Sequence, residues 1–141
     1  MPLNAETVEK IDELLSQLKE KLADGAKLLV EGKKDVIAMR KLGFEENVLK
    51  ISFGGPLLNA VQELVRLKEV ILLPDFDERG EELLKFYSKH LERLGVKCDV
   101  EVWKKLRKMV KKDVHDIEGF VNFFLRQKER LLNPRSNRRI F

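Results

Sequence analysis

The sequence predicts an α/β protein with a Rossmann-like, four-stranded parallel sheet that carries helices on both faces. Apolar runs that lack polar alternation end at Val30, Phe53 and Leu73. Such runs are typical of parallel strands that are buried on both faces. Amphipathic helical patterns separate the runs, and a fourth run is expected after residue 95. This βαβαβαβ order indicates a doubly wound parallel sheet, with extra helices at the N- and C-terminal ends.

The first part of the chain begins with an amphipathic helix over residues 5–23, capped by Asn4 and stopped by Asp24-Gly25. A strand over 26–30 and a helix over 33–42 follow. Asp35 falls in the first turn of that helix, where a carboxylate suits the helix dipole, so helix support is its expected role. The helix is expected to turn its apolar residues inward: Val36, Ile37, Met39 and Leu42.

The middle of the chain contains a buried run over 48–53, which ends in Gly54-Gly55-Pro56. Pro56 suits the first turn of a helix that continues to Arg66. Exposed amides in this glycine turn could bind a phosphate, although the turn serves equally well as a plain connector. The central strand over 70–73 comes next.

The second half of the chain contains a helix over 78–94 that Gly95 ends. Its expected buried stripe consists of Leu83, Leu84, Tyr87, Leu91 and Leu94. Residues 96–102 alternate between apolar and polar side chains, which predicts a strand near the sheet edge. A short basic helix over 103–110 and an amphipathic helix over 116–132 follow. We therefore expect a helix in residues 1–25 that packs on a domain over 26–115, with residues 116–141 forming the C-terminal helix and basic tail of that domain.

Length and composition exclude several classes of protein. A chain of 141 residues is most simply one domain. Its one cysteine, Cys98, excludes an internal disulfide and a cysteine-based zinc site, and His90 and His115 are isolated. No apolar stretch approaches the ~18 residues of a membrane span, and no signal-peptide pattern is present. We therefore expect a soluble cytoplasmic protein without a membrane partner.

Basic residues are concentrated towards the end of the chain. Residues 101–141 contain 12 Lys and Arg against 5 Asp and Glu, although the net charge of the whole chain is only +4. This asymmetry favours an anionic partner, with nucleic acid the leading candidate, and a solvated basic surface is the alternative. The candidate nucleic-acid-binding residues are Lys33, Lys34, Arg79, Lys104, Lys105, Arg107, Lys108, Lys111 and Lys112. Arg135, Arg138 and Arg139 follow in the tail.

Three acidic residues follow predicted strands directly. Asp75 and Asp77 come after the central strand, and Glu31 follows the first strand. Ligands bind at the carboxyl ends of the strands in open α/β sheets. Closely spaced carboxylates there supply the hard oxygen ligands that suit Mg²⁺. The sequence thus favours a magnesium site if the two strands are neighbours. Alternatively, Asp77 only caps the following helix and Asp75 is a loop residue.

Two stretches of the sequence resemble the toprim domain of topoisomerases, bacterial primases and small nucleases. They are Leu29-Val30-Glu31-Gly32-Lys33-Lys34-Asp35 and Leu73-Pro74-Asp75-Phe76-Asp77-Glu78-Arg79-Gly80, and the order of elements between them matches as well. The similarity covers about residues 26–115. It is greatest to small stand-alone toprim proteins of archaea and bacteria, and to the bacterial nuclease that matures precursor 5S ribosomal RNA.

The resemblance implies roles for individual residues. It implies that Glu31 is a metal ligand or a general acid/base, and that Asp75 and Asp77 are the Mg²⁺-binding pair. Together these three residues form the expected catalytic and metal site. Lys112-Asp113 loosely resembles a Lys-Asp pair that follows the fourth strand in primases, although Asp113 could instead cap the last helix.

The resemblance to the toprim domain also limits which of the family's activities this chain can have. A topoisomerase needs a positioned tyrosine, and the one tyrosine, Tyr87, lies on the expected apolar stripe of a helix. A primase needs further domains and a zinc module, for which the chain has neither the length nor the cysteines. A metal-dependent nuclease that acts on structured RNA, or on DNA, therefore remains. The alternatives are a non-catalytic Mg²⁺-binding module that docks onto RNA or protein, and a vestigial site that binds metal too weakly to matter.

Overall fold

The computed structural model describes residues 3–51, 64 and 66–133. Within them, four parallel strands form one sheet in the order β2-β1-β3-β4. The strands are β1 (Lys27–Val30), β2 (Val48–Lys50), β3 (Glu69–Leu72) and β4 (Lys97–Asp99). The predicted parallel α/β sheet is therefore confirmed. The Gly54-Gly55-Pro56 turn, most of the helix expected up to Arg66, and the tail arginines lie outside the described residues.

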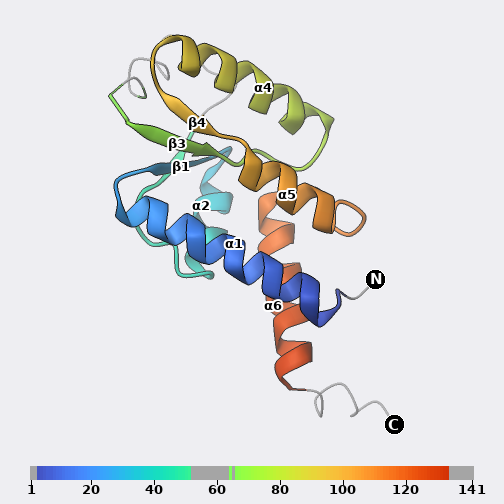
Figure 1. The fold of residues 1–141 in the computed structure, drawn as a ribbon. Helices are drawn as coiled ribbons and strands as arrows, with labels where there is room; N and C mark the ends of the chain where they lie inside the picture. The colour runs from blue at the N-terminus through green and yellow to red at the C-terminus, as the bar shows by residue number, and fades with distance from the viewer. Residues whose placement is uncertain (1–2, 52–63, 65, 134–141) are drawn as a thin grey trace.

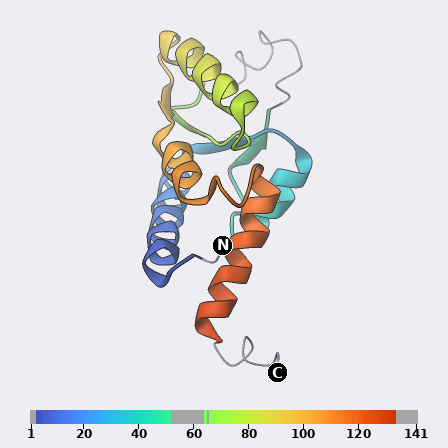
Figure 2. The ribbon, with the colours of Figure 1, turned by 90° about the vertical axis from the view of Figure 1, so that its right-hand side faces the viewer.

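Helices cover both faces of this sheet, as predicted (Figure 1). Helix α4 (Glu78–Arg93) lies on one face, and α1 (Ala5–Ala23), α2 (Lys33–Arg40) and α6 (Ile117–Leu132) lie on the other (Figures 1 and 2). Helix α5 (Glu101–Val110) continues from the carboxyl end of β4 and packs against β3. Helix α6 packs against both α1 and α2. No described helix combines the length and the apolar character that crossing a membrane requires.

Polar caps fix where the helices begin. Asn4 caps α1 as predicted, since its side chain accepts a hydrogen bond from the Thr7 amide at 2.8 Å. Asp116 caps α6 in the same way, with 2.6 Å between its Oδ1 and the Gly119 nitrogen. The suggestion that Asp113 caps this helix is therefore wrong. The reason is that α6 starts at Ile117, four residues after Asp113.

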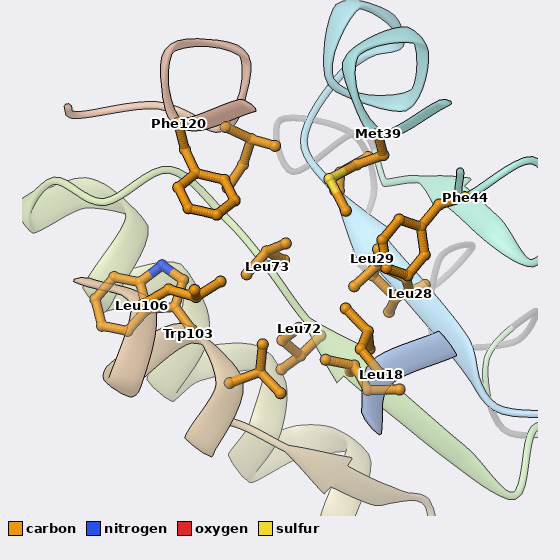
Figure 3. Packing of buried hydrophobic residues seen from close by; sticks show 14 of the residues in the cluster. Leu18, Leu28, Leu29, Met39, Phe44, Leu72, Leu73, Trp103, Leu106 and Phe120 are labelled. Carbon is orange, nitrogen blue, oxygen red and sulfur yellow. The ribbon is translucent and has the colours of Figure 1, made fainter. Parts of the chain in front are cut away.

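The core lies between the sheet and the helices (Figure 3). Leu28, Leu29 and Leu72 from β1 and β3 are fully buried there, together with Trp103 of α5 and Phe120 of α6. The Phe76 ring, from the loop after β3, lies 6.0 Å from the ring centroids of both Trp103 and Phe120. The core thus extends from the sheet into the loop that carries the two aspartates.

Three expectations about burial are wrong. The run over 48–53 was expected to be a buried strand, but Leu49 is 40% exposed, because β2 lies at the edge of the sheet and, among the described strands, pairs with β1 alone. Ile37 is 45% exposed because α2 turns Ala38 and Met39 to the core instead. Leu94 is 52% exposed because it is the C-cap residue of α4, where the helical spacing no longer holds. The alternating strand expected over 96–102 is shorter, since α5 already begins at Glu101.

The contrast between a central and an edge strand predicts unequal costs for two similar truncations. Leu29→Ala, at a fully buried position of β1, should lower the free energy of unfolding by about 2–5 kcal/mol, because it leaves a cavity. Leu49→Ala, on the exposed edge, should cost about 1 kcal/mol or less. Urea denaturation of both variants measures the difference. Equal costs would contradict the edge position of β2.

Candidate metal site

The predicted acidic site forms where β1 and β3 end side by side. The two strands are parallel neighbours, with Leu29 opposite Leu72. Glu31 and Asp75 follow them, and the Asp75 backbone nitrogen donates a hydrogen bond to Glu31 Oε2 at 2.8 Å. The pairing of the strands therefore brings two of the three predicted acids together at the carboxyl edge of the sheet.

The loop that carries Asp75 is held by the C-terminal helices. The Trp103 indole nitrogen, from α5, donates to the carbonyl oxygens of Pro74 at 2.9 Å and Asp75 at 3.2 Å. The Phe76 nitrogen donates to the carbonyl oxygen of His115, just before α6, at 2.7 Å. The Ile117 nitrogen, at the start of α6, donates a long hydrogen bond of 3.4 Å to Asp75 Oδ1. The position of the aspartate thus depends on helices that come after the sheet.

Gly80 allows α4 to start directly against this loop. A Cβ atom at position 80 would lie only 1.8 Å from the Asp75 carbonyl oxygen, which no side chain can tolerate. A glycine is therefore required three residues after Asp77, because the first turn of the helix presses on the backbone of the acidic loop.

The electrostatics of the site keep a proton on Asp75 near neutral pH. Burial, the adjacent Glu31 carboxylate and the charge of Asp35 together raise the pKa of the Asp75 carboxyl to about 7, and burial is the largest of these causes. The hydrogen bond from the Ile117 amide acts in the opposite direction but is the smallest of these influences. Full ionisation of these neighbouring carboxylates is therefore unfavourable in this partly buried setting.

Asp35 is more closely tied to this site than the sequence suggested. Its Oδ2 accepts a hydrogen bond from the Gly32 amide at 3.1 Å, so the predicted role in helix support is confirmed. The side chain is only 1% exposed, however, and Oδ1 is buried without a hydrogen-bond partner in the described residues. Burial raises the pKa of the Asp35 carboxyl, and Glu31 and Asp116 add to this effect. A water molecule, a cation or a proton would satisfy a buried carboxylate oxygen of this kind.

Asp77 is exposed and caps α4. Its Oδ1 accepts a hydrogen bond from the Gly80 amide at 2.7 Å, which confirms that Asp77 caps this helix. A capping carboxylate retains a second oxygen, so this role does not prevent metal binding. Whether Asp77 is also a metal ligand stays a prediction.

Arg79 pairs with Glu31. Its guanidinium nitrogen lies 2.9 Å from Glu31 Oε1, and the arginine side chain is 66% exposed whereas that of Glu31 is 11% exposed. Arg79 was predicted to contact nucleic acid; here it partly balances the charge of the acidic site. Because the arginine is largely exposed, this ion pair is expected to contribute little to the stability of the fold.

The residues at this edge fit a divalent cation held by few protein ligands. No three His, Cys, Asp or Glu side chains within the described ranges are arranged as a complete metal site. Mg²⁺ is typically bound by one or two carboxylates together with water and substrate phosphates. Glu31 and Asp75 provide such a pair, and the buried carboxylate of Asp35 adds negative charge near them.

Apart from Arg79 on α4, the predicted basic residues lie on two elements. Lys33 and Lys34 are exposed in the first turn of α2. The remainder belong to α5 and the residues just after it, where Arg107 packs over the Trp103 ring at 5.0 Å and pairs with Glu81 at 2.9 Å. The lysines of this group are all exposed: Lys104, Lys105, Lys108, Lys111 and Lys112.

The parallel sheet and the acidic pair at its carboxyl edge define an α/β domain with a ligand site at the strand ends. The family model of the toprim domain matches residues 26–100. A UPF0292 protein of Pyrococcus abyssi is 37% identical over 130 residues, which cover 92% of this chain and 96% of the relative. A UPF0292 protein of Methanosarcina barkeri is 36% identical over 117 residues, covering 82% and 81% of the two chains.

One solved structure, described as a putative protein from Aquifex aeolicus, has the same fold. Its TM-score is 0.58 at 32% sequence identity, and the match covers 83% of this chain and 98% of that one. The chain therefore belongs to the toprim family, together with the UPF0292 proteins of archaea. Toprim domains typically bind a divalent metal ion, so family membership indicates a metal-binding domain.

The raised pKa of Asp75 predicts an unusual effect of pH on stability. The folded carboxyl titrates near 7, whereas an unfolded aspartate titrates at about 3.9. Between these values the folded state binds more protons than the unfolded state, so this group makes the wild type less stable as pH rises. Asp75→Asn, measured in EDTA, should therefore gain stability relative to the wild type as pH rises from 5 to 7, and it should be clearly more stable than the wild type at pH 8.

Thermal unfolding across this pH range tests the prediction, with the exposed Asp24→Asn as the matched control. The control should follow the wild type at every pH. A loss of stability in Asp75→Asn throughout the range would show instead that the charged form of Asp75 supports the fold.

Proposed function

We propose that this protein is a Mg²⁺-dependent phosphodiesterase that acts on structured RNA. The proposal is supported above all by the contact between Glu31 and Asp75 at the ends of adjacent parallel strands, within a toprim domain. Hydrolysis of a phosphodiester requires positive charge beside the phosphate, a water nucleophile and a group that manages protons. The described site has residues suited to each requirement.

Asp75 and Glu31 would hold the cation, and Asp77 extends the acidic set towards solvent from the start of α4. Mg²⁺, when bound there, would stabilise the charge that develops on the phosphate and orient a water molecule. Glu31 pairs through Oε1 with the exposed Arg79, and this oxygen would become free to accept a proton if Arg79 turned to a substrate phosphate. The N-terminal end of α4 adds further positive potential for an anionic substrate.

The preference for RNA depends on similarity alone. Among enzymes of comparable size, the resemblance described above is greatest to a nuclease that acts on ribosomal RNA, which is an analogy at the level of the family and not of the site. The basic surface of α5 suits either nucleic acid, since phosphates of RNA and DNA carry the same charge.

A non-catalytic binding module is the second candidate, and one observation favours it. Arg79 pairs with Glu31 at 2.9 Å, and Asp77 already caps α4, so two of the three predicted acids have structural partners. In that case the domain binds Mg²⁺ and docks onto RNA or a protein without cleaving either. The two candidates differ in whether a bound substrate is converted to product.

Cleavage assays on precursor ribosomal RNA and on duplex DNA, with Mg²⁺ or with EDTA, distinguish them. Asp75→Asn and Glu31→Gln should each lower the rate of cleavage by about a thousandfold or more, because several kcal/mol of charge stabilisation is lost. Glu31→Gln should retain more Mg²⁺ affinity than Asp75→Asn if proton transfer is its main role. Asp24→Asn should cleave like the wild type.

A protein that binds Mg²⁺ and RNA tightly but cleaves neither substrate would support the binding module. Cleavage that persists unchanged in Asp75→Asn would contradict both candidates, because it would place the activity outside the acidic site.

A further inference from the structure

A groove of about 440 Å³ runs between α4 and α5, and we call it the α4–α5 groove. Five cationic side chains line it against a single carboxylate, that of Glu81. The cationic residues are Lys85, Lys104, Arg107, Lys108 and Lys111. Lys85 was not among the predicted nucleic-acid-binding residues, because it is distant in sequence from the basic cluster and only the fold brings it there.

The positive charges in this groove are only partly neutralised. Glu81 pairs with Arg107 at 2.9 Å and with Lys85 at 3.5 Å. These cations lower the pKa of Glu81, with Arg107 the larger influence. Lys104, Lys108 and Lys111 make no ion pair with any residue that the structure describes, and all three are exposed. The groove therefore presents a surplus of uncompensated positive charge to solvent.

The spacing of the three unpaired lysines suits a polyanion with regularly spaced charges. They stand at positions i, i+4 and i+7, which lie on one face of a helix. At 1.5 Å per residue they span about 10 Å along α5 and its C-cap. One strand of a nucleic-acid duplex carries a phosphate every ~3.4 Å along the axis. A span of about 10 Å holds about four phosphates of one backbone, so the three lysines can contact phosphates along a single strand, whereas a single small anion would need them to converge.

Trp103 joins the groove to the acidic loop. Its side chain lines the groove, and its indole nitrogen donates to the carbonyl oxygens of Pro74 and Asp75. Glu81, on the opposite wall, is only four residues from Asp77 and donates its backbone amide to the Asp77 carbonyl oxygen at 3.0 Å. The groove thus begins beside the residues of the candidate metal site, at the edge to which the strands of Figure 1 point.

We propose that the α4–α5 groove binds the phosphate backbone of a nucleic acid and leads it to the acidic edge of the sheet. This inference deepens the proposed function and relies on it for the identity of the anion. Lys104, Lys108 and Lys111 contact the phosphates, and Glu81 opposes binding while holding Arg107 over the Trp103 ring. Lys33 and Lys34, on α2, lie outside this groove.

Fluorescence anisotropy with a labelled RNA hairpin, and with duplex DNA of equal length, tests the groove separately from catalysis. Binding is measured in EDTA over a series of salt concentrations, so that metal-dependent cleavage is absent. The triple variant Lys104→Gln/Lys108→Gln/Lys111→Gln should bind the nucleic acid about tenfold more weakly or worse. The slope of its log affinity against log salt concentration should also be shallower, by the amount that about two to three phosphate contacts contribute. Glu81→Gln should bind roughly twofold more tightly or better, because a repulsive charge is removed.

The matched control is Lys19→Gln/Arg40→Gln/Lys41→Gln, which removes the same charge from exposed positions on α1, at the end of α2 and just after it. This control should retain most of the affinity and the salt dependence of the wild type. Equal losses in the two triple variants would overturn the proposal, since net charge alone would then explain binding. A wild type that binds neither RNA nor DNA would overturn it as well.

The result of this binding test does not depend on whether the protein hydrolyses the nucleic acid. Binding through the groove without cleavage in Mg²⁺ would uphold this inference and reject the phosphodiesterase. If the triple lysine variant kept both the affinity and the cleavage rate of the wild type, the phosphodiesterase would be upheld and the α4–α5 groove rejected as the binding site.

Discussion

The hydrogen bond from the Asp75 amide to the Glu31 carboxylate is the contact on which the site depends. It joins the ends of β1 and β3, which are far apart in sequence and become neighbours only when the sheet forms. The bond fixes one Glu31 oxygen and places the Asp75 side chain beside it. Two carboxylates held this close in a partly buried setting repel each other, so the site binds a proton or a cation. The same contact therefore determines both the geometry and the chemistry of the acidic edge.

The helices that follow the sheet complete this arrangement. Residues beyond the toprim match, which ends at 100, supply the indole of Trp103 and the backbone groups of His115 and Ile117 that hold the aspartate loop. Helix α5 is thus both a support for the acidic loop and the basic wall of the α4–α5 groove. A change in α5 is expected to affect metal binding through the loop and nucleic-acid binding through its lysines, and separate variants are needed to tell these effects apart.

Much of this organisation could be predicted from the sequence, because local patterns carry it. Unbroken apolar runs identify parallel strands, and acids directly after such runs must lie at the carboxyl edge. Other features depend on tertiary neighbours. The exposure of Leu49 depends on which strand is at the edge, and the partner of Arg79 depends on how α4 meets β1. The burial of Asp35 was also missed, because a carboxylate in a first helical turn gives no sign of what covers it. The three-residue step from Asp77 to Gly80 was the available signal for the cap and for close contact with the loop.

Isothermal titration of Mg²⁺ at several pH values, in buffers that differ in ionisation enthalpy, tests the central claim most directly. If Glu31 and Asp75 hold the cation, the proton on Asp75 must leave on binding. With a pKa of about 7, the wild type should release about half a proton at pH 7 and close to one at pH 6, and Mg²⁺ should bind about tenfold more weakly at pH 6 than at pH 8. Asp75→Asn should lose this binding. Tight Mg²⁺ binding without proton release, unchanged in Asp75→Asn, would contradict the account.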